Sequence, residues 1–126
     1  MLKKLLVDTN VLIDYSKGHS QLLEKYLIIK EWQPAVNPVI VAEYINDKWL
    51  ISPERKRKAE AFIDLFTHVD LTKKIGFKTG ELLRTGQAEY LGDALIAATC
   101  LTEKMVLLTR NQKHFRKVKG LKLLPR

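Results

Sequence analysis

Short unbroken apolar runs mark the strands that this chain is expected to form. The run Leu5-Leu6-Val7 is typical of a strand that is buried on both faces, and Asp8 stands at its carboxyl end. The run over residues 105–109 has the same character and leads into a polar turn over residues 110–114. Two buried strands that each end in polar residues are therefore predicted.

Between these two runs, apolar residues recur at helical spacing. Residues 21–31 are predicted to form a helix with an apolar side and a polar side, and Pro34 is expected to end it. Ala35-Val36 is predicted as a second strand. Asn37 as N-cap and Pro38 as first helical residue then open a helix that places Glu43 in its second turn. The apolar positions of this helix are Val39, Ala42, Ile45 and Trp49.

The second half of the chain repeats the alternation. Ser52-Pro53-Glu54 starts a helix with an apolar stripe to residue 66, residues 69–71 are a short strand, and Thr72 caps a helix to about residue 83. A helix over residues 93–101 has Asp93 in its first turn, and residues 121–124 are a last edge strand. The pattern predicts a single α/β/α domain over residues 1–126 with a mostly parallel sheet, whose ligands bind beyond the carboxyl ends of the strands.

The composition indicates a globular domain with a large positive net charge. A chain of 126 residues that is 46% hydrophobic can fill one core, and its 22 basic against 14 acidic residues give a net charge of +8, which attracts polyanions. Cys100 is the only cysteine, so no internal disulfide forms, and we expect it to be buried. The start is basic and then apolar like a signal peptide, but Asp8 and Asn10 interrupt it. No stretch is long enough to cross a membrane, so a cytoplasmic location is expected.

Three carboxylates carry the chemical hypothesis. Asp8 follows a strand, Glu43 lies early in a helix and Asp93 starts another, so all three are expected at one edge of the sheet. Convergent carboxylates repel each other unless a cation is present, and Mg²⁺ and Mn²⁺ prefer such oxygen ligands. A site of this kind can polarise a phosphodiester for hydrolysis. An Asp at a strand end or helix start is equally often only a cap.

The residues around these acids carry a family resemblance. The blocks are Val7-Asp8-Thr9-Asn10-Val11-Leu12-Ile13-Asp14, Val41-Ala42-Glu43-Tyr44, Gly92-Asp93-Ala94-Leu95-Ile96-Ala97-Ala98-Thr99, and Leu108-Thr109-Arg110-Asn111 ending in His114-Phe115. In this order they resemble the PIN-domain family, most closely its VapC-like toxins. Each block alone is weak, but together they cover most of the chain.

The resemblance implies a three-layer α/β/α PIN-like fold and a divalent-metal-dependent endoribonuclease, with Mg²⁺ or Mn²⁺ as cofactor. It also implies a homodimer and a cognate antitoxin, as for the toxin of a type II toxin-antitoxin pair. Asp8, Glu43 and Asp93 match the family's acidic metal-site positions. The matching polar supporting positions are Thr9, Asn10 and Thr109.

The last block departs from the family pattern. Many relatives carry a fourth acid where Asn111 stands or where His114 stands, and neither residue is acidic here. Asn111 can still support the site through its amide, and His114 can contact phosphate or act as an acid, although an exposed histidine without a role is the more common case. Asp14 and Glu89 are possible substitutes, although each is more often an ordinary surface acid.

Basic side chains provide two candidate RNA contacts. Residues 55–58 are a dense basic run that, on a helix, points in several directions and is often only a solvated face. The preferred contact follows the last buried strand, because the acids are expected to meet there. Its residues are Arg110, Lys113, His114, Arg116 and Lys117, with Lys119 and Lys122 beyond them. Trp32, Tyr44, Trp49 and Phe62 fit a core role better than base stacking or a dimer face.

Two other functions compete with the nuclease hypothesis. A non-catalytic PIN-like module that binds RNA or a partner protein is favoured by the missing fourth acid. Phosphotransfer enzymes of other α/β classes also place an Asp after the first strand. Haloacid-dehalogenase-like phosphatases, however, need a second Asp where this chain has Asn10, and the acidic pair and strand-end Lys of receiver domains are not evident.

Overall fold

A computed structural model describes residues 2–29 and 31–126, and a parallel five-stranded sheet forms its centre. The strand order is β3-β2-β1-β4-β5, and every neighbouring pair is parallel. The strands are β1 (Lys3–Val7), β2 (Trp32–Val36), β3 (Thr67–His68), β4 (Val106–Leu108) and β5 (Leu123–Leu124). The predicted strands at residues 5–7 and 106–108 are adjacent, with Val7 opposite Leu108.

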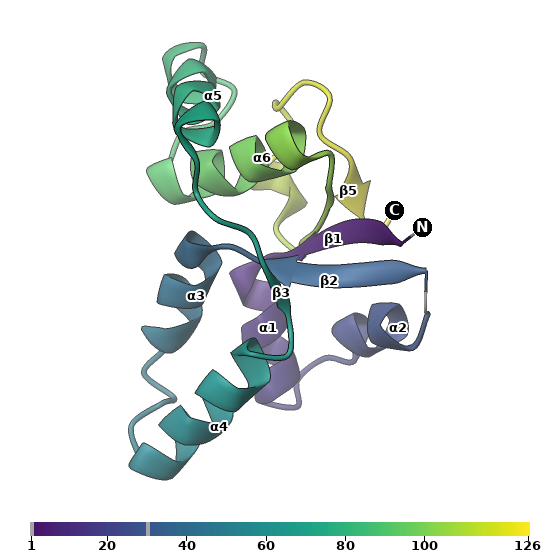
Figure 1. Ribbon diagram of the computed structural model, residues 1–126, viewed down its shortest axis with the longest axis vertical. Coiled ribbons are helices and arrows are strands. Elements are labelled where there is room, and N and C mark those ends of the chain that lie inside the picture. Colours follow the sequence, from purple (N-terminus) through teal and green to yellow (C-terminus); the bar gives the residue numbers. More distant parts are fainter. Residues whose placement is uncertain (1, 30) are drawn as a thin grey trace.

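Helices cover both faces of the sheet, which confirms the three-layer arrangement (Figure 1). On one face lies α6 (Leu91–Glu103), with α5 (Lys73–Arg84) outside it. On the other face lie α1 (Thr9–Ser16), α2 (Leu22–Ile28) and α4 (Pro53–Ile63). The remaining helix, α3 (Pro38–Ile45), stands at the carboxyl edge of the sheet, where it contacts both α1 and α6. No helix in the described ranges has the length and apolar character that a membrane crossing requires.

The centre of the sheet is apolar on both sides, as the runs predict. Leu5, Leu6 and Val7 are fully buried, and so are Leu107 and Leu108 beside them. Helix α6 lies between this surface and α5, and most of its buried residues are small. These buried small residues are Ala94, Ala97, Ala98, Thr99 and Cys100. The predicted buried cysteine, Cys100, is confirmed.

Two predictions in the first third of the chain were wrong or incomplete. No helix was predicted directly after Asp8, yet α1 starts at Thr9 with Asp8 as its N-cap. The helix expected over residues 21–31 is shorter, Leu22–Ile28, and Pro34 lies inside β2 instead of ending that helix. A proline lacks the N–H for a strand ladder, but β3 pairs with β2 only at Ala35 and Val36, so the position is an edge.

Two further boundaries also differ from the predictions. The third strand is Thr67–His68, not residues 69–71, because pairing with Ala35 and Val36 fixes its register. The helix that holds Glu43 ends at Ile45, so Trp49 lies beyond it and is 42% exposed. Three helix starts were predicted correctly, since the side chains of Asn37, Ser52 and Thr72 each accept a hydrogen bond from their helix's first turn, whereas the helix expected from residue 93 begins at Leu91.

Candidate functional site

The three predicted acids line one open pocket at the carboxyl edge of the sheet. Asp8 comes from the end of β1, Glu43 from α3 and Asp93 from the first turn of α6. Figure 1 shows why these segments meet, because α3 and the start of α6 both lie where β1 and β2 end. The supporting residues Thr9, Asn10 and Asn111 line the same pocket, and Thr109 bonds to Asp8 beneath it.

Asp8 is held in place by hydrogen bonds on both carboxylate oxygens. The backbone N–H of Thr9 donates to Oδ1 at 2.8 Å, and the buried Thr109 hydroxyl donates to Oδ2 at 2.7 Å. The side chain is almost completely buried. Burial raises the pKa of Asp8, the two hydrogen bonds lower it, and repulsion from Glu43 and Asp93 raises it further. A positive charge placed here would relieve both the desolvation and the repulsion.

Glu43 is tied to the same end of β1 by a neighbouring threonine. The Thr9 hydroxyl donates a 2.6 Å hydrogen bond to Glu43 Oε1, so Thr9 contacts Asp8 through its backbone and Glu43 through its side chain. Gly92 leaves room for the other oxygen, since a Cβ at that position would lie 3.3 Å from Glu43 Oε2. The glycine before Asp93 therefore allows α3 and α6 to bring their acids to one pocket.

Asp93 contacts the histidine that stands in place of a possible fourth acid. His114 Nδ1 lies 3.0 Å from Asp93 Oδ2 and 3.0 Å from Asn111 Nδ2. This nitrogen donates to Asp93 when it carries a proton and accepts from Asn111 when it does not. His114 is therefore part of the site and not a loop histidine without contacts. It offers a neutral or positive group where an acid would add negative charge.

The other candidate acids do not line the pocket. Asp14 forms a 2.6 Å salt bridge with Arg110, so its charge is already compensated. Glu89 lines a neighbouring depression, which also includes Asp93 and His114. Asn10 accepts a long hydrogen bond, 3.4 Å, from the backbone of Arg110. Neither Asp14 nor Glu89 takes the position of a fourth carboxylate between the three predicted ones.

The predicted RNA contacts fall on two sides of the short helix η1 (Gln112–His114). Lys113, His114 and Lys117 line the depression that shares Asp93 with the acid pocket. Arg110, Lys113 and Arg116 line another depression on the side of Pro125. Only the first group borders the acids directly, so Lys113 and Lys117 have the better position for contacting a phosphate there.

Two polar residues line this pocket that were not predicted from the sequence, Tyr90 and Asn46. Tyr90, the N-cap of α6, is 57% exposed, and its ring lies 6.1 Å from that of His114. Asn46, the C-cap of α3, also lines the pocket. A signal for Tyr90 existed, because an aromatic residue stands immediately before the Leu91-Gly92-Asp93 segment. Asn46 follows Glu43 by three residues, and nothing in its local sequence distinguishes it from an ordinary C-cap.

The donor set fits a hard divalent cation. The pocket offers carboxylate oxygens from three segments, with amide and hydroxyl oxygens nearby, and these are the ligands that Mg²⁺ and Mn²⁺ prefer. Among residues 2–29 and 31–126, no three His, Cys, Asp or Glu side chains are already arranged to hold an ion. Asp8, Glu43 and Asp93 as shared ligands of one cation therefore stay a prediction.

Comparison with known proteins assigns the family. Residues 5–121 match the sequence profile described as the PIN domain. A ribonuclease VapC1 of Rickettsia felis is 29% identical over an alignment of 133 positions, which covers 95% of this chain and 94% of the relative. A ribonuclease VapC1 of Methanocaldococcus jannaschii is 28% identical over 126, covering 95% and 86% respectively.

A solved structure has the same fold. One chain in the crystal structure of DNA-bound VapBC from Salmonella typhimurium superposes with a TM-score of 0.81. The match covers 98% of this chain and 97% of that chain at 24% sequence identity. The similarity therefore extends over the whole α/β/α arrangement, including the edge of the sheet where the acids lie.

Proposed function

The chain belongs to the PIN domain family, and we propose that it is a divalent-metal-dependent endoribonuclease that hydrolyses RNA phosphodiester bonds. The observation that carries the proposal is the buried Asp8 carboxylate, which two hydrogen bonds orient in a pocket that Glu43 and Asp93 share. A purely structural cap needs neither the Thr109 hydroxyl nor two further acids beside it. The ribonuclease names of the two relatives support the same activity.

In this proposal Asp8, Glu43 and Asp93 hold Mg²⁺ or Mn²⁺. When bound, such a cation supplies Lewis-acid activation of the phosphodiester and of water. The chain's own hydroxyl groups orient the carboxylates: Thr109 and the backbone of Thr9 fix Asp8, and the Thr9 side chain fixes Glu43. His114 can exchange a proton at Nδ1, which lies between Asp93 and Asn111.

We further propose that the protein is the toxin of a toxin-antitoxin pair, which binds a cognate antitoxin and forms a homodimer. The support comes from similar proteins. Structures with the same fold are described as a VapBC bound to DNA and as a toxin-antitoxin complex from Klebsiella pneumoniae. Co-expression with the product of a neighbouring reading frame, followed by measurement of the mass of the complex, tests this part.

The activity is tested with purified protein and a single-stranded RNA. We expect chelator to stop cleavage and Mg²⁺ or Mn²⁺ to restore it, and Asp8→Asn, Glu43→Gln and Asp93→Asn each to suppress it without loss of folding. Circular dichroism is the control for folding. Cleavage that persists in chelator, or that survives all three substitutions, would show that these acids are not the active site.

A non-catalytic RNA- or partner-binding module is the second candidate. Its support is the neutral Asn111 and the His114 contact to Asp93, which make the pocket less negative than a site with a fourth acid. Such a protein would bind RNA or its partner in chelator and in Mg²⁺ alike. If cleavage appears only after Asn111→Asp or His114→Asp, the module is the better description of the natural protein.

A further inference from the structure

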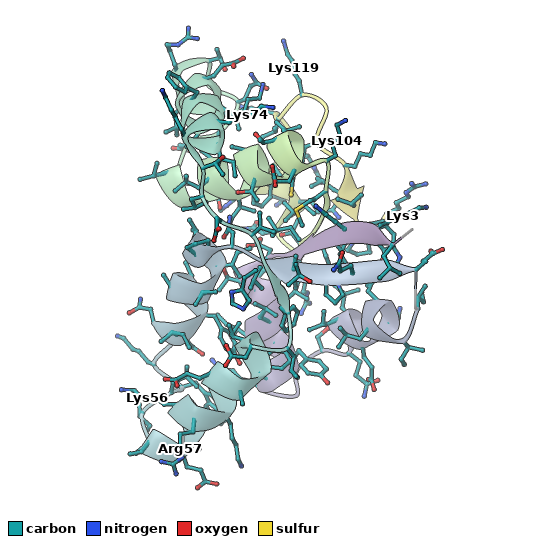
Figure 2. All side chains as sticks on the ribbon, in the orientation of Figure 1. Lys3, Lys56, Arg57, Lys74, Lys104 and Lys119 are labelled. Atoms are coloured by element: carbon teal, nitrogen blue, oxygen red, sulfur yellow. The ribbon has the colours of Figure 1, made fainter. Side chains whose placement is uncertain are left out.

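A wide basic groove lies between α5 and α6, away from the three acids. Its basic side chains are Lys73, Lys74, Lys78, Arg84, Lys104 and Lys119, against the single acid Glu81 among its lining residues. Glu81 approaches only Lys78, at 3.7 Å. Figure 2 shows Lys74, Lys104 and Lys119 at one end of the molecule, although they come from α5, from the end of α6 and from the segment before β5. The groove is therefore a concentrated positive surface, in which six basic side chains stand against one carboxylate, that of Glu81.

The floor of the groove is open helix backbone. Gly76 and Gly80 lie one turn apart on α5, and a Cβ at either position would meet no atom within 4 Å. Glycine disfavours a helix, so a packing contact would be its usual reason, and none exists here among the described residues. Phe77, which also lines the groove, is 72% exposed, with the Lys73 ammonium 5.8 Å from its ring centroid. These features leave space and an aromatic face for a ligand outside the protein.

The groove adjoins the acid pocket through a second depression. Lys113 and Lys117 line that depression together with Asp93 and His114, which it shares with the acid pocket. The depression meets the groove at a hydrogen bond between their linings. The backbone N–H of Lys119, which lines the groove, donates to Oε1 of Gln87, which lines the depression, at 3.0 Å. Asp93 and the groove residue Leu101 are eight residues apart on α6, a rise of about 12 Å. Basic side chains therefore line the surface from the acid pocket to the groove.

We propose that the groove between α5 and α6 binds the sugar-phosphate backbone of an RNA strand whose scissile phosphate lies in the acid pocket. Lysine and arginine side chains contact phosphates, the glycine floor admits the strand close to α5, and Phe77 stacks on a base. This inference rests on the proposed function. It adds that the substrate is a single strand long enough to reach from Asp93 past Lys117 to Lys104.

Charge and shape favour RNA over other occupants. A second copy of this chain would bring the same lysines to the groove, and like charges would repel. An acidic protein segment would satisfy the lysines but has no need of an exposed aromatic ring beside an open backbone. A nucleic acid strand uses both features, since every base has a face that stacks on an aromatic side chain.

The first test compares two variants of equal charge. Fluorescence anisotropy in chelator measures binding of a labelled single-stranded RNA of about 16 nucleotides to the full chain. Lys74→Glu with Lys104→Glu changes the groove, and Lys56→Glu with Arg57→Glu makes the same charge change on α4, at the opposite end of the molecule (Figure 2). We expect the groove variant to weaken binding at least about tenfold and the α4 variant less than about twofold, because screening limits distant charges.

The second test fills the groove without changing its charge. Gly80→Gln is expected to raise the melting temperature by roughly 4 °C, because glutamine favours a helix, and to weaken RNA binding. Phe77→Leu, compared with wild type, tests the aromatic stack by the same measurement. A variant that melts higher yet binds less RNA has lost contacts of the groove and not its fold.

Several outcomes would overturn the proposal. Equal losses in the groove and α4 variants would assign RNA binding to the overall charge, and unchanged binding in both would exclude the groove. If Gly80→Gln alters the oligomeric state but not RNA affinity, the occupant is a second copy. The test is separate from catalysis: RNA cleavage without groove-dependent binding refutes only this proposal. Groove-dependent binding without cleavage in any metal refutes the proposed function and leaves the groove as an RNA-binding site.

Discussion

The acid pocket and the basic groove use the same helix, α6, in opposite ways. At its first turn, Asp93 joins Asp8 and Glu43 in a pocket whose carboxylates are oriented by buried hydroxyl groups. At its last turn, Leu101 and Lys104 form a wall of a groove that has flexible basic side chains and an open glycine floor. Chemistry on a phosphodiester needs fixed ligands, whereas attraction of a polyanion needs only charge at the right place. Substitutions in the two regions should therefore have different consequences.

Among substitutions in the two regions, Asp8→Asn is expected to have the largest effect on RNA cleavage. Loss of the charged ligand should reduce RNA cleavage by more than about 10²-fold, beyond the usual effect of a supporting residue. The same change should stabilise the metal-free protein by about 1 kcal/mol, a common gain for one favourable substitution, because it removes a buried charge beside Glu43 and Asp93. Cleavage assays and thermal melts in chelator measure the two effects.

The pH dependence of that stability gain has a definite sign. Because the pKa of Asp8 is raised above the ordinary 3.8, wild type has its full stability below that pH and loses some as pH rises through the raised pKa. The advantage of Asp8→Asn should thus appear at neutral pH and vanish below pH 3.8. Saturating Mg²⁺ should stabilise wild type and not the variant. If Asp8→Asn is less stable than wild type at neutral pH in chelator, the charge of Asp8 does not destabilise the fold.

A second, smaller effect is expected from Thr109→Val, which keeps the side-chain shape but removes the hydroxyl. Thr109 donates to Asp8 Oδ2 and accepts from the Asn111 backbone N–H, so both groups lose a partner. Cleavage should fall about 10- to 100-fold, and the free energy of unfolding should fall by about 1–3 kcal/mol. Thr109→Ser, which retains the hydroxyl, is the control. Equal activity of the Val and Ser variants would show that Asp8 needs no orientation by Thr109.

The third prediction concerns the charge of the pocket. Asn111→Asp adds a carboxylate beside the three acids and should strengthen Mg²⁺ or Mn²⁺ binding on the order of tenfold, because wild type is expected to hold at most one tight ion before RNA binds. Gln112→Asp is the matched control, since Gln112 lines a different depression. Calorimetric titration measures both. Two tight sites in the wild type, or an equal gain from both variants, would contradict this account.

The sequence predicted the acid pocket better than the groove for a physical reason. Asp8 stands at the end of a strand, Glu43 in the second turn of the helix that follows β2, and Asp93 in the first turn of a helix, and these segments meet at one edge of a parallel sheet. The Thr9 to Glu43 bond joins residues 34 positions apart, and only packing of α1 against α3 brings them together. The groove lysines come from three segments without a common motif, so the sequence showed only their total charge.

The boundaries that were predicted wrongly also have local causes. Asp8 ends β1 and caps α1 at the same time, so no loop separates the strand from the helix, and the short apolar pattern over Val11 and Leu12 was overlooked. Pro34 is ordinarily a strand breaker, but the two-residue β3 leaves its position unpaired on one side. Both cases depend on neighbouring strands, which local patterns do not contain.

The smallest effects are predicted for the substitution of one glycine in each region. Gly80→Ala has open space around its new methyl group and should raise the free energy of unfolding by about 1 kcal/mol, the usual difference between the two residues in a helix. Gly92→Ala places its Cβ 3.3 Å from Glu43 Oε2, so that carboxylate must shift by a few tenths of an ångström. For an RNA too short to reach the groove, cleavage should then fall by roughly tenfold or less in Gly92→Ala and stay unchanged in Gly80→Ala. Chemical denaturation and cleavage rates of both variants test the comparison. Loss of activity in Gly80→Ala, or full activity in Gly92→Ala, would show that the fixed pocket and the open groove do not differ as their geometry indicates.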